Sequence, residues 1–413
     1  MRHIIHHLSK SRRIYLTILV AALGYFVDVF DIQLFGIVRV RSLQSLGLTP
    51  DQITLTGAHL LNWQMGGMLL GGLAWGALGD KKGRIEVLFG TILLYSLGNI
   101  ANAFVTSIPA YAAARFVAGF GLAGEIGAGI ALASELIPKE SRSYATILIA
   151  IFGTMGPVAG SFVANALPWR WAYVAGGIMG LLLLLLRVSV RESGLFDAMK
   201  KHHPGARRGH FRMFFTKRSR LFQYLGCIGL ALPIWFTLGI IVIFSPELGM
   251  ALGTDEPLKA SSSVVSFFVG QTLGGLACGL LSQAFRNRRI VIAIFIAGAA
   301  ATLSGILLAK GISASGFYAL LMLASIFCGY WGLFLTVTAE CFGTNLRTMA
   351  VSTVSNFVRA SVIIDTLSVA ALKPVIGLIG SIGIVGGAGF LLALIAVWRL
   401  PETFTRDLDY IEH

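Results

Sequence analysis

The chain has 413 residues, of which 56% are apolar and only 13% are charged, and its mean hydropathy is +0.79. Soluble domains carry about 25% charged residues, so this composition excludes an ordinary soluble protein and predicts an integral membrane protein. The net charge of +14 would suit nucleic-acid binding in a soluble protein. In a membrane protein it is more typical of basic residues that hold loops on the cytoplasmic side.

Apolar runs of about 20 residues, the length needed to cross a bilayer, recur along the chain between short polar bends. They predict an all-α integral membrane protein with twelve transmembrane helices. The first six helices are expected at 15–38, 54–78, 86–106, 110–136, 144–167 and 170–189. The second six are expected at 221–246, 261–284, 290–310, 316–340, 347–370 and 377–399.

The basic residues are distributed unequally between alternate bends. If the N-terminus is inside, 25 of the 33 lysines and arginines fall on the cytoplasmic side and six fall outside. This bias predicts a multi-pass protein of the inner (plasma) membrane with both termini in the cytoplasm. Because topology accounts for the positive charge, we expect no nucleic-acid partner.

The only long polar segment divides the chain into two groups of six spans. We therefore expect an N-terminal six-helix bundle at 1–189, a cytoplasmic linker at 190–220, and a C-terminal six-helix bundle with a short cytoplasmic tail at 221–413. The linker is either an amphipathic segment on the inner leaflet, where basic residues meet anionic lipid, or a solvated connection.

The two halves repeat each other at an offset of 205 residues. Glu135 and Arg142 follow the fourth span, and Glu340 and Arg347 follow the tenth span with the same spacing. Such an offset indicates two six-helix pseudo-repeats, which is the plan of many secondary transporters.

The bend after the second span, from Gly76 to Arg84, reads Gly-Ala-Leu-Gly-Asp-Lys-Lys-Gly-Arg. It resembles the loop signature of the major facilitator superfamily. The matching positions in this loop are Gly76, Asp80, Lys81, Gly83 and Arg84. Other positions that resemble family motifs are Arg115, Gly119, Gly124, Glu125, Glu135, Pro138, Arg142, Pro401, Glu402 and Thr403.

Motifs within the chain resemble different branches of this family. Asp28-Val-Phe-Asp31 is similar to a motif of aromatic-acid and related organic-ion symporters, with valine in place of glycine. The fourth-span motifs resemble those of metabolite–proton symporters, and the C-terminal Pro-Glu-Thr is similar to the sugar porters. Gly156-Pro157 instead looks like a signature of drug–proton antiporters, although small-residue packing at a proline kink explains it equally well.

Ionisable side chains inside spans are costly unless they are paired or hydrated, so each one is a candidate for function. Asp28 and Asp31 share one face of the first span because they are three residues apart. Burial and mutual repulsion favour proton uptake by one of them. Glu125 is either a further proton carrier or a hydrogen-bonding residue in helix packing.

Two arginines lie within the spans. The resemblance implies that the first and fourth helices line a central cavity, so that Arg115 can reach Asp28 or Asp31. A substrate anion that takes the arginine would then free the carboxylate for a proton; a static ion pair is the alternative. Arg359 is the better candidate for a substrate carboxylate, because a guanidinium can bind it through two donors, and Asn356 lies one turn before it.

Further candidates for substrate binding are polar or aromatic residues within spans, although helix packing would explain most of them: Asn62, Gln64, Gln271, Trp235, Tyr330, Trp331 and Asp365. A cytoplasmic gate is expected at the helix ends from Gly76, Asp80, Lys81, Gly83, Arg84, Glu135, Arg142, Glu340 and Arg347. The cysteines lack metal-ligand spacing with one another or with a histidine, so no metal site is predicted from them. His3, His6 and His7 are expected to belong to a solvated basic tail, with a metal site as the alternative.

Together these features predict a secondary active transporter that works by alternating access. We predict proton-coupled uptake of a small organic anion or zwitterion by a monomer in the lipid bilayer, with the proton as coupling ion and no cofactor. A proton-driven antiporter that exports a drug, siderophore or metabolite is the alternative, and a non-transporting sensor on the same fold is a third possibility. No enzyme is predicted, because the chain shows no nucleophile–histidine arrangement and no nucleotide-binding loop.

Overall fold

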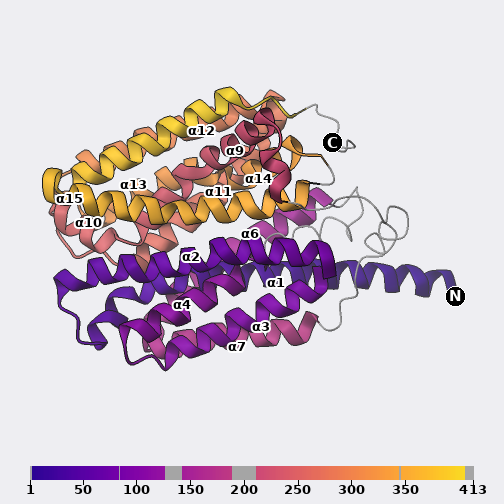
Figure 1. The fold of residues 1–413 in the computed structure, drawn as a ribbon, viewed down its shortest axis with the longest axis horizontal. Coiled ribbons are helices and arrows are strands. Elements are labelled where there is room, and N and C mark those ends of the chain that lie inside the picture. Colours follow the sequence, from indigo (N-terminus) through magenta and orange to yellow (C-terminus); the bar gives the residue numbers. More distant parts are fainter. Residues whose placement is uncertain (1, 83, 126–141, 188–210, 344–345, 405–413) are drawn as a thin grey trace.

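The computed structural model describes the chain apart from residues 1, 83, 126–141, 188–210, 344–345 and 405–413. For some helical residues, among them 2–18, 79–82, 84–85 and 142–150, it describes the backbone alone. Within the described residues all regular structure is helical and forms an elongated bundle of two halves that lie side by side (Figure 1).

The N-terminal half runs up and down the bundle in long helices joined by short turns. Its helices are α1 (Arg2–Ser45), α2 (Pro50–Lys82), α3 (Arg84–Ala103), α4 (Ile108–Leu122), α6 (Arg142–Ala166) and α7 (Trp169–Arg187). The end at which α1 begins is called the near end below, and the opposite end is called the far end.

The C-terminal half has the same up-and-down course but more interruptions. Its elements are η1 (Phe211–Phe215), α9 (Arg218–Phe236), η2 (Thr237–Val242), α10 (Ser245–Leu252), α11 (Ala260–Phe285), α12 (Arg288–Leu308), α13 (Ala314–Phe327), η3 (Cys328–Tyr330), α14 (Trp331–Cys341) and α15 (Arg347–Arg399). The long α15 ends at the near end, where α1 begins (Figure 1).

This arrangement confirms the predicted all-α fold of twelve spans in two groups of six. The predicted span 316–340 corresponds to α13, η3 and α14 together, and the last two predicted spans both lie in α15. Gly377 separates these two because its φ of 73° reverses the chain, a conformation that glycine adopts without steric cost. The second part of the predicted fourth span and most of the predicted linker lie outside the described residues.

Turn residues at the far end and in the loops explain several helix boundaries. The side chains of Ser107, Asn287 and Ser313 cap the first turns of α4, α12 and α13, which satisfies backbone N–H groups that have no partner inside the helix. Gly253 ends α10 with a left-handed conformation, at a φ of 71°.

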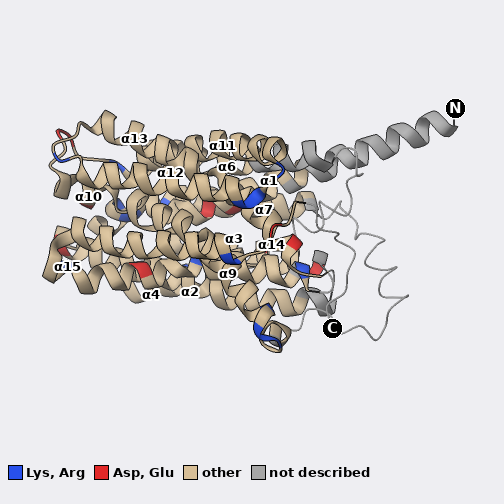
Figure 2. Cartoon of the chain, turned by 90° about the horizontal axis from the view of Figure 1, so that it is seen from above, with Lys and Arg blue, Asp and Glu red and all other residues tan. Residues whose placement is uncertain are grey.

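The outer surface of the bundle suits lipid. Six stretches of the described residues are long and apolar enough to cross a membrane, and the last, Met349–Arg399, includes both passes of α15. Large apolar side chains such as Phe162, Leu280 and Trp398 point outward and are more than half exposed. Charged residues are sparse along the described part of the bundle (Figure 2). The chain is therefore a multi-pass membrane protein.

Equivalent helix pairs in the two halves are held together by close backbone contacts at glycine. A Cβ atom on Gly67 of α2 would overlap the carbonyl oxygen of Phe116 in α4, and a Cβ on Gly274 of α11 would overlap that of Ile326 in α13. Small residues that let helix backbones approach are typical of helix packing in membranes. The repeat seen in the sequence is thus also a repeat of packing.

Replacing Gly67 by alanine should destabilise the N-terminal half by about 1–3 kcal/mol, because the added methyl group forces α2 away from α4. Thermal unfolding in detergent is expected to show a lower Tm. Gly66→Ala is the matched control, since nothing lies within 4 Å of a Cβ at Gly66 and alanine favours the helix. Equal Tm values for the two variants would contradict the packing role of Gly67.

Candidate functional site

Four of the buried charged side chains form a group inside the bundle, and they come from both halves. Asp28 and Asp31 of α1, Arg115 of α4 and Arg359 of α15 each expose 2% of their surface or less. Burying a charge in an apolar bundle costs several kcal/mol unless it is compensated locally. The partners of these four residues therefore indicate what the site can do.

Arg359 provides the ionic contact between the halves at this level. Its Nη2 lies 3.8 Å from Oδ2 of Asp28, and its guanidinium lies 5.5 Å from the ring centroid of Trp235. The Nε and Nη1 atoms of Arg359 have no hydrogen-bond partner among the described residues. A buried guanidinium with two free donors and one loosely held carboxylate can accept a second anion.

Arg115 is held in a different way. Its Nε donates to Oδ1 of Asn102 at 3.0 Å, its Nη2 to Oδ1 of Asn99 at 2.9 Å, and its Nη1 to Oε1 of Gln64 at 3.5 Å. The ring of Tyr173 lies 4.8 Å from the guanidinium. Neutral amides thus occupy Arg115, and this fixes its position.

Asp31 lies on the face of α1 that meets α7. A Cβ on Gly176 of α7 would overlap Oδ1 of Asp31, so the carboxylate needs a glycine at that place. Asp31 is close enough to Arg115 and Asp28 to interact with both electrostatically, and it lies beside the amide of Asn99. Asp31 therefore lies near Arg115, but the side chains that are hydrogen-bonded to Arg115 are amides.

Aromatic side chains line the C-terminal side of this charge group. The rings of Trp235 and Trp331 lie 6.3 Å apart in an edge-to-face arrangement, and Tyr25 of α1 is in hydrogen-bond contact with Trp331. Tyr330 instead donates to the backbone of Leu230 inside the C-terminal half, which is a packing role.

Two predicted polar residues form bonds across the seam between the halves. Asn62 of α2 accepts from Thr366 at 2.8 Å, and Asn356 of α15 donates to the carbonyl of Ala123 at 3.0 Å. Both bonds lie where α2 and α4 meet α15, away from the carboxylates. Neither residue is brought to the charge group by a described contact.

The remaining predicted residues are more dispersed. Gln64 both accepts from Arg115 and donates to the carbonyl of Ile32, so it belongs to the setting of Arg115. Gln271 and Asp365 are half-buried on α11 and α15, and Glu125 is buried at the end of the described part of the fourth span. Their proposed roles in binding and proton transfer stay predictions.

The far end carries an ion pair between the halves that the sequence analysis missed. Arg39 of α1, fully buried, lies 2.7 Å from Glu247 of α10 and also donates to the carbonyl of Ile243. Thr54 of α2 donates to the same carboxylate at 3.2 Å. Arg39 and Glu247 are 208 residues apart, close to the repeat offset, so a comparison of equivalent helix ends could have found the pair.

At the near end, the described gate residues make contacts within or between the halves. Glu340 pairs with Arg288 at 2.7 Å, and Arg347 donates to the carbonyl of Ala339. A Cβ on Gly76 would lie 3.1 Å from the sulfur of Met349 in the other half. Gly83 and Glu135 lie outside the described residues, as do the side chains of Asp80, Lys81, Arg84 and Arg142, so the gate stays a prediction.

Glu402 of the Pro-Glu-Thr motif closes the start of α12. Its carboxylate accepts from the backbone N–H groups of Arg288 and Arg289, at 3.2 and 3.1 Å, and from those of the two residues after it. Partial burial raises the pKa of Glu402, but these four donors together bring it below the usual value. An ionised carboxylate at a helix N-terminus is stabilising.

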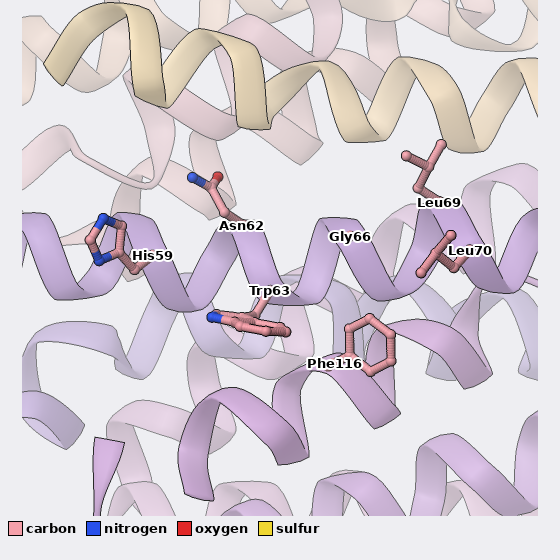
Figure 3. A pocket seen from close by; sticks show the side chains of 7 residues that line it. All are labelled: His59, Asn62, Trp63, Gly66, Leu69, Leu70 and Phe116. Carbon is pink, nitrogen blue, oxygen red and sulfur yellow. The ribbon is translucent and has the colours of Figure 1, made fainter. Parts of the chain in front are cut away.

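A groove of about 410 Å³ lies apart from the charge group, on the outer side of α2 and α4. Its lining is largely apolar and includes Trp63, which is 53% exposed. Figure 3 shows Trp63 and Phe116 on one side of α2 and Asn62 and Leu69 on the other. The lining residues are His59, Asn62, Trp63, Gly66, Leu69, Leu70 and Phe116.

Comparison with known proteins gives a consistent result. The family profile described as Major Facilitator Superfamily matches residues 21–264. A Bacillus subtilis protein assigned to niacin/nicotinamide transport is 27% identical over 367 residues, covering 86% of this chain and 87% of the relative. The 3-(3-hydroxy-phenyl)propionate transporter of Escherichia coli is 28% identical over 290 residues, covering 67% of each chain.

Other similar proteins are named for other solutes. The proline/betaine transporter of Salmonella typhimurium is 26% identical over 371 residues, covering 81% of this chain and 73% of the relative. A solved structure of the proton:xylose symporter bound to 6-bromo-6-deoxy-D-glucose matches with a TM-score of 0.71 at 18% identity, covering 95% of this chain and 97% of that one. At this identity the structural likeness concerns the fold.

Removing one partner of the Arg39–Glu247 pair should open the far end. Glu247→Gln leaves Arg39 without its counter-charge, and breaking a buried pair in this way costs about 3–5 kcal/mol, so the state that exposes Arg39 to water gains population. Spin labels on Asp51→Cys and Glu256→Cys, which are exposed positions on opposite halves, are expected to show longer distances. The native cysteines are all buried and should not compete for label.

The control is the double variant Arg39→Met with Glu247→Leu. It removes both charges and keeps side chains of similar size, so the closed distance should persist. If Glu247→Gln leaves the distance distribution unchanged, the ion pair does not hold the far end.

Proposed function

Because the chain belongs to the major facilitator superfamily, a family of transporters rather than enzymes, we propose that it is a proton-coupled importer of a small organic anion. The substrate class, the proton coupling and the direction are parts of this proposal. It rests on the charge group formed by Asp28, Asp31, Arg115 and Arg359.

The observation that carries the proposal is the state of Arg359. Its Nε and Nη1 are buried without a hydrogen-bond partner among the described residues, and its Nη2 is 3.8 Å from Asp28 in the other half. A carboxylate can accept two parallel hydrogen bonds from a guanidinium. A substrate carboxylate would therefore replace Asp28 as the close partner of Arg359.

This exchange would couple the substrate to a proton. When the substrate neutralises Arg359, Asp28 loses its counter-charge inside the bundle, and a lone buried carboxylate is costly unless it takes up a proton. Asp31, three residues further along α1, can pass or share that proton. The loaded carrier then contains a paired substrate and a neutral aspartate, whereas the empty carrier contains the Asp28–Arg359 pair, and both states can cross without an unpaired charge.

The aromatic residues favour a substrate with a planar ring. Trp235 lies beside the guanidinium of Arg359 and against Trp331, so a ring attached to a bound carboxylate would meet indole faces and edges. Two of the relatives are named for niacin and 3-(3-hydroxy-phenyl)propionate, which are ring-bearing acids. A zwitterion such as proline or betaine, named for a third relative, presents the same carboxylate without an aromatic ring.

We assign the near end to the cytoplasm, because most lysines and arginines then lie inside, and the membrane to the inner (plasma) membrane of the cell. The Arg39–Glu247 pair would then close the outward side. We also propose that the protein functions as a monomer, since both halves of the charge group come from one chain. Export by proton antiport is the alternative. Its motif, Gly156-Pro157, has a packing explanation, because a Cβ on Gly156 would overlap the carbonyl of Phe26.

Proteoliposomes with an imposed proton gradient test this proposal. Acid outside should drive accumulation of nicotinate or 3-(3-hydroxyphenyl)propionate, and Asp31→Asn should abolish accumulation while leaving counterflow exchange of the same solute. Loss of both activities in Asp31→Asn would indicate a structural role for this residue. If acid outside fails to drive uptake but the reversed gradient drives export, the importer proposal is wrong.

Arg359→Lys should raise the KM of uptake about 10- to 100-fold, because lysine keeps the charge but cannot donate two parallel hydrogen bonds to a carboxylate. The change is measured as initial uptake rate against solute concentration at saturating external acidity. Tyr330→Phe serves as the control, since Tyr330 bonds to the backbone of its own half, and its KM should stay within about twofold of the wild-type value. An unchanged KM in Arg359→Lys would show that the substrate carboxylate does not bind to Arg359.

A further inference from the structure

Asn99 is a fully buried amide on α3, one turn from the far end of that helix. Its Oδ1 accepts from Nη2 of Arg115 at 2.9 Å. A guanidinium has only donors, so this contact determines the orientation of the amide and leaves its Nδ2, the donor atom, facing the other way.

The group beside that donor is Asp31. The carboxylate of Asp31 lies near the Asn99 side chain. The structure shows no hydrogen bond between the two: Asn99 Nδ2 and both oxygens of Asp31 are buried without a hydrogen-bond partner among the described residues. A buried amide donor and a buried carboxylate that both lack alternatives each gain by meeting.

Helix packing brings the two together through small residues on α7. Gly176 gives room for Asp31 on one side, and the next residue, Gly177, lies against the α3 backbone, where a Cβ would be 2.8 Å from the carbonyl oxygen of Ser96. Asn99 is one turn after Ser96 on the same helix. The close approach of α3 and α1 to one stretch of α7 thus places the amide at the carboxylate.

We propose that Asn99 is a positioning residue that links Arg115 to Asp31: it accepts from the arginine and donates to the carboxylate, and in this way sets how tightly Asp31 holds its proton. The proposal rests on the proton-coupled transport proposed above. No assigned motif includes Asn99, and its role follows from its bond to Arg115 and from the unpaired donor that it carries near Asp31.

An amide between the two charges suits a proton carrier better than a direct ion pair would. A direct Arg–Asp contact is a strong charge-assisted bond and would keep the carboxylate ionised throughout the cycle. Without any donor, the buried carboxylate would stay protonated. A donor polarised by Arg115 stabilises the ionised form by an intermediate amount, so Asp31 can exchange its proton when the site opens to water.

Other groups also act on Asp31 and define what Asn99 adds. Arg115 and Asp28 interact with it electrostatically, Tyr173 faces it from α7, and Arg359 acts through Asp28. Of the other helices packed on α1, α6 and α11 have no charged residue at 151–166 or 260–285. The charged and titratable residues of α2 are Asp51 and His59 in its first three turns and Asp80, Lys81 and Lys82 in its last turn. Asn102, another amide bonded to Arg115, donates its Nδ2 to the carbonyl of Gly98. It therefore holds the arginine but has no donor near the Asp31 carboxylate.

The test measures protonation of Asp31 directly. The carboxyl C=O stretching band of the purified protein is followed by infrared difference spectroscopy across pH, and in each variant it is assigned by its loss on adding Asp31→Asn. Asn99→Leu removes both contacts, Asn99→Asp keeps the acceptor for Arg115 and replaces the donor, and Asn102→Leu removes only a contact to Arg115. Tm values of the variants verify that each is folded.

The titration midpoint should rise by about one pH unit in Asn99→Leu, roughly a tenfold gain in proton affinity for the loss of a donor to a charged group. Asn99→Asp should rise at least as far, because a like charge replaces the donor. Asn102→Leu should stay within about 0.3 pH unit of wild type, since its contact does not reach the carboxylate.

A folded Asn99→Leu protein with an unchanged midpoint would overturn the role of Asn99 and leave proton-coupled transport intact. Equal shifts in Asn99→Leu and Asn102→Leu would also overturn it, because the effect would then come from moving Arg115. If no wild-type band disappears in Asp31→Asn at any pH, Asp31 carries no exchangeable proton, and this assignment fails together with the role of Asp31 in coupling, whatever the uptake assay shows for the solute.

Discussion

A charge inside an apolar helix bundle needs a local partner, and this constraint organises the interior of the protein. The exterior faces lipid and offers no compensation. Among the described residues, both buried aspartates and two of the buried arginines, Arg115 and Arg359, form one group where α1, α4 and α15 meet. The same cost makes these groups responsive: when a neighbouring charge binds a substrate, a buried carboxylate needs a new partner or a proton.

The two arginines of this group, Arg115 and Arg359, meet this constraint in opposite ways. Amides of α2 and α3 and the ring of Tyr173 surround Arg115, so it is a fixed charge of the N-terminal half. Arg359 has one carboxylate at 3.8 Å and unused donors, and in the proposed cycle it is the exchangeable charge of the C-terminal half. Duplication supplied two similar bundles, and their divergence places a fixed charge on one side of the seam and an exchangeable one on the other.

A contact of the same kind joins the two halves at the far end. Arg39 and Glu247 come from nearly equivalent helix ends of the two repeats and carry opposite charge. The pair is buried while the halves meet there and would be hydrated when they part. In the open state water solvates both side chains. The pair therefore changes the balance between the closed and open states more than it changes the free energy of unfolding. Alternating access needs contacts of this type, which are specific but not permanent.

Length, hydropathy and the placement of basic residues were enough to predict twelve spans in two halves, because crossing a bilayer requires runs of apolar residues whatever their tertiary contacts. The same physical cost marked Asp28, Asp31, Arg115 and Arg359 in the sequence, since a charge in such a run stands out. Neutral residues stand out less: the polar candidates include Gln64, which contacts Arg115, but not Asn99 or Asn102. Asn99 and Asn102 look like ordinary helix-packing amides until α3 is placed against α4 and α7. Asn62 and Asn356 are the same kind of residue in the sequence, but they lie between the two halves. Arg39 was counted as a loop charge, and its pairing with Glu247 appears only when the far ends of the halves are brought together. Hydropathy along the chain identifies the residues that need a compensating partner, because a charge in an apolar run is costly. The partner of each residue depends on distances between helices that are far apart in the chain, so it follows from the tertiary structure alone.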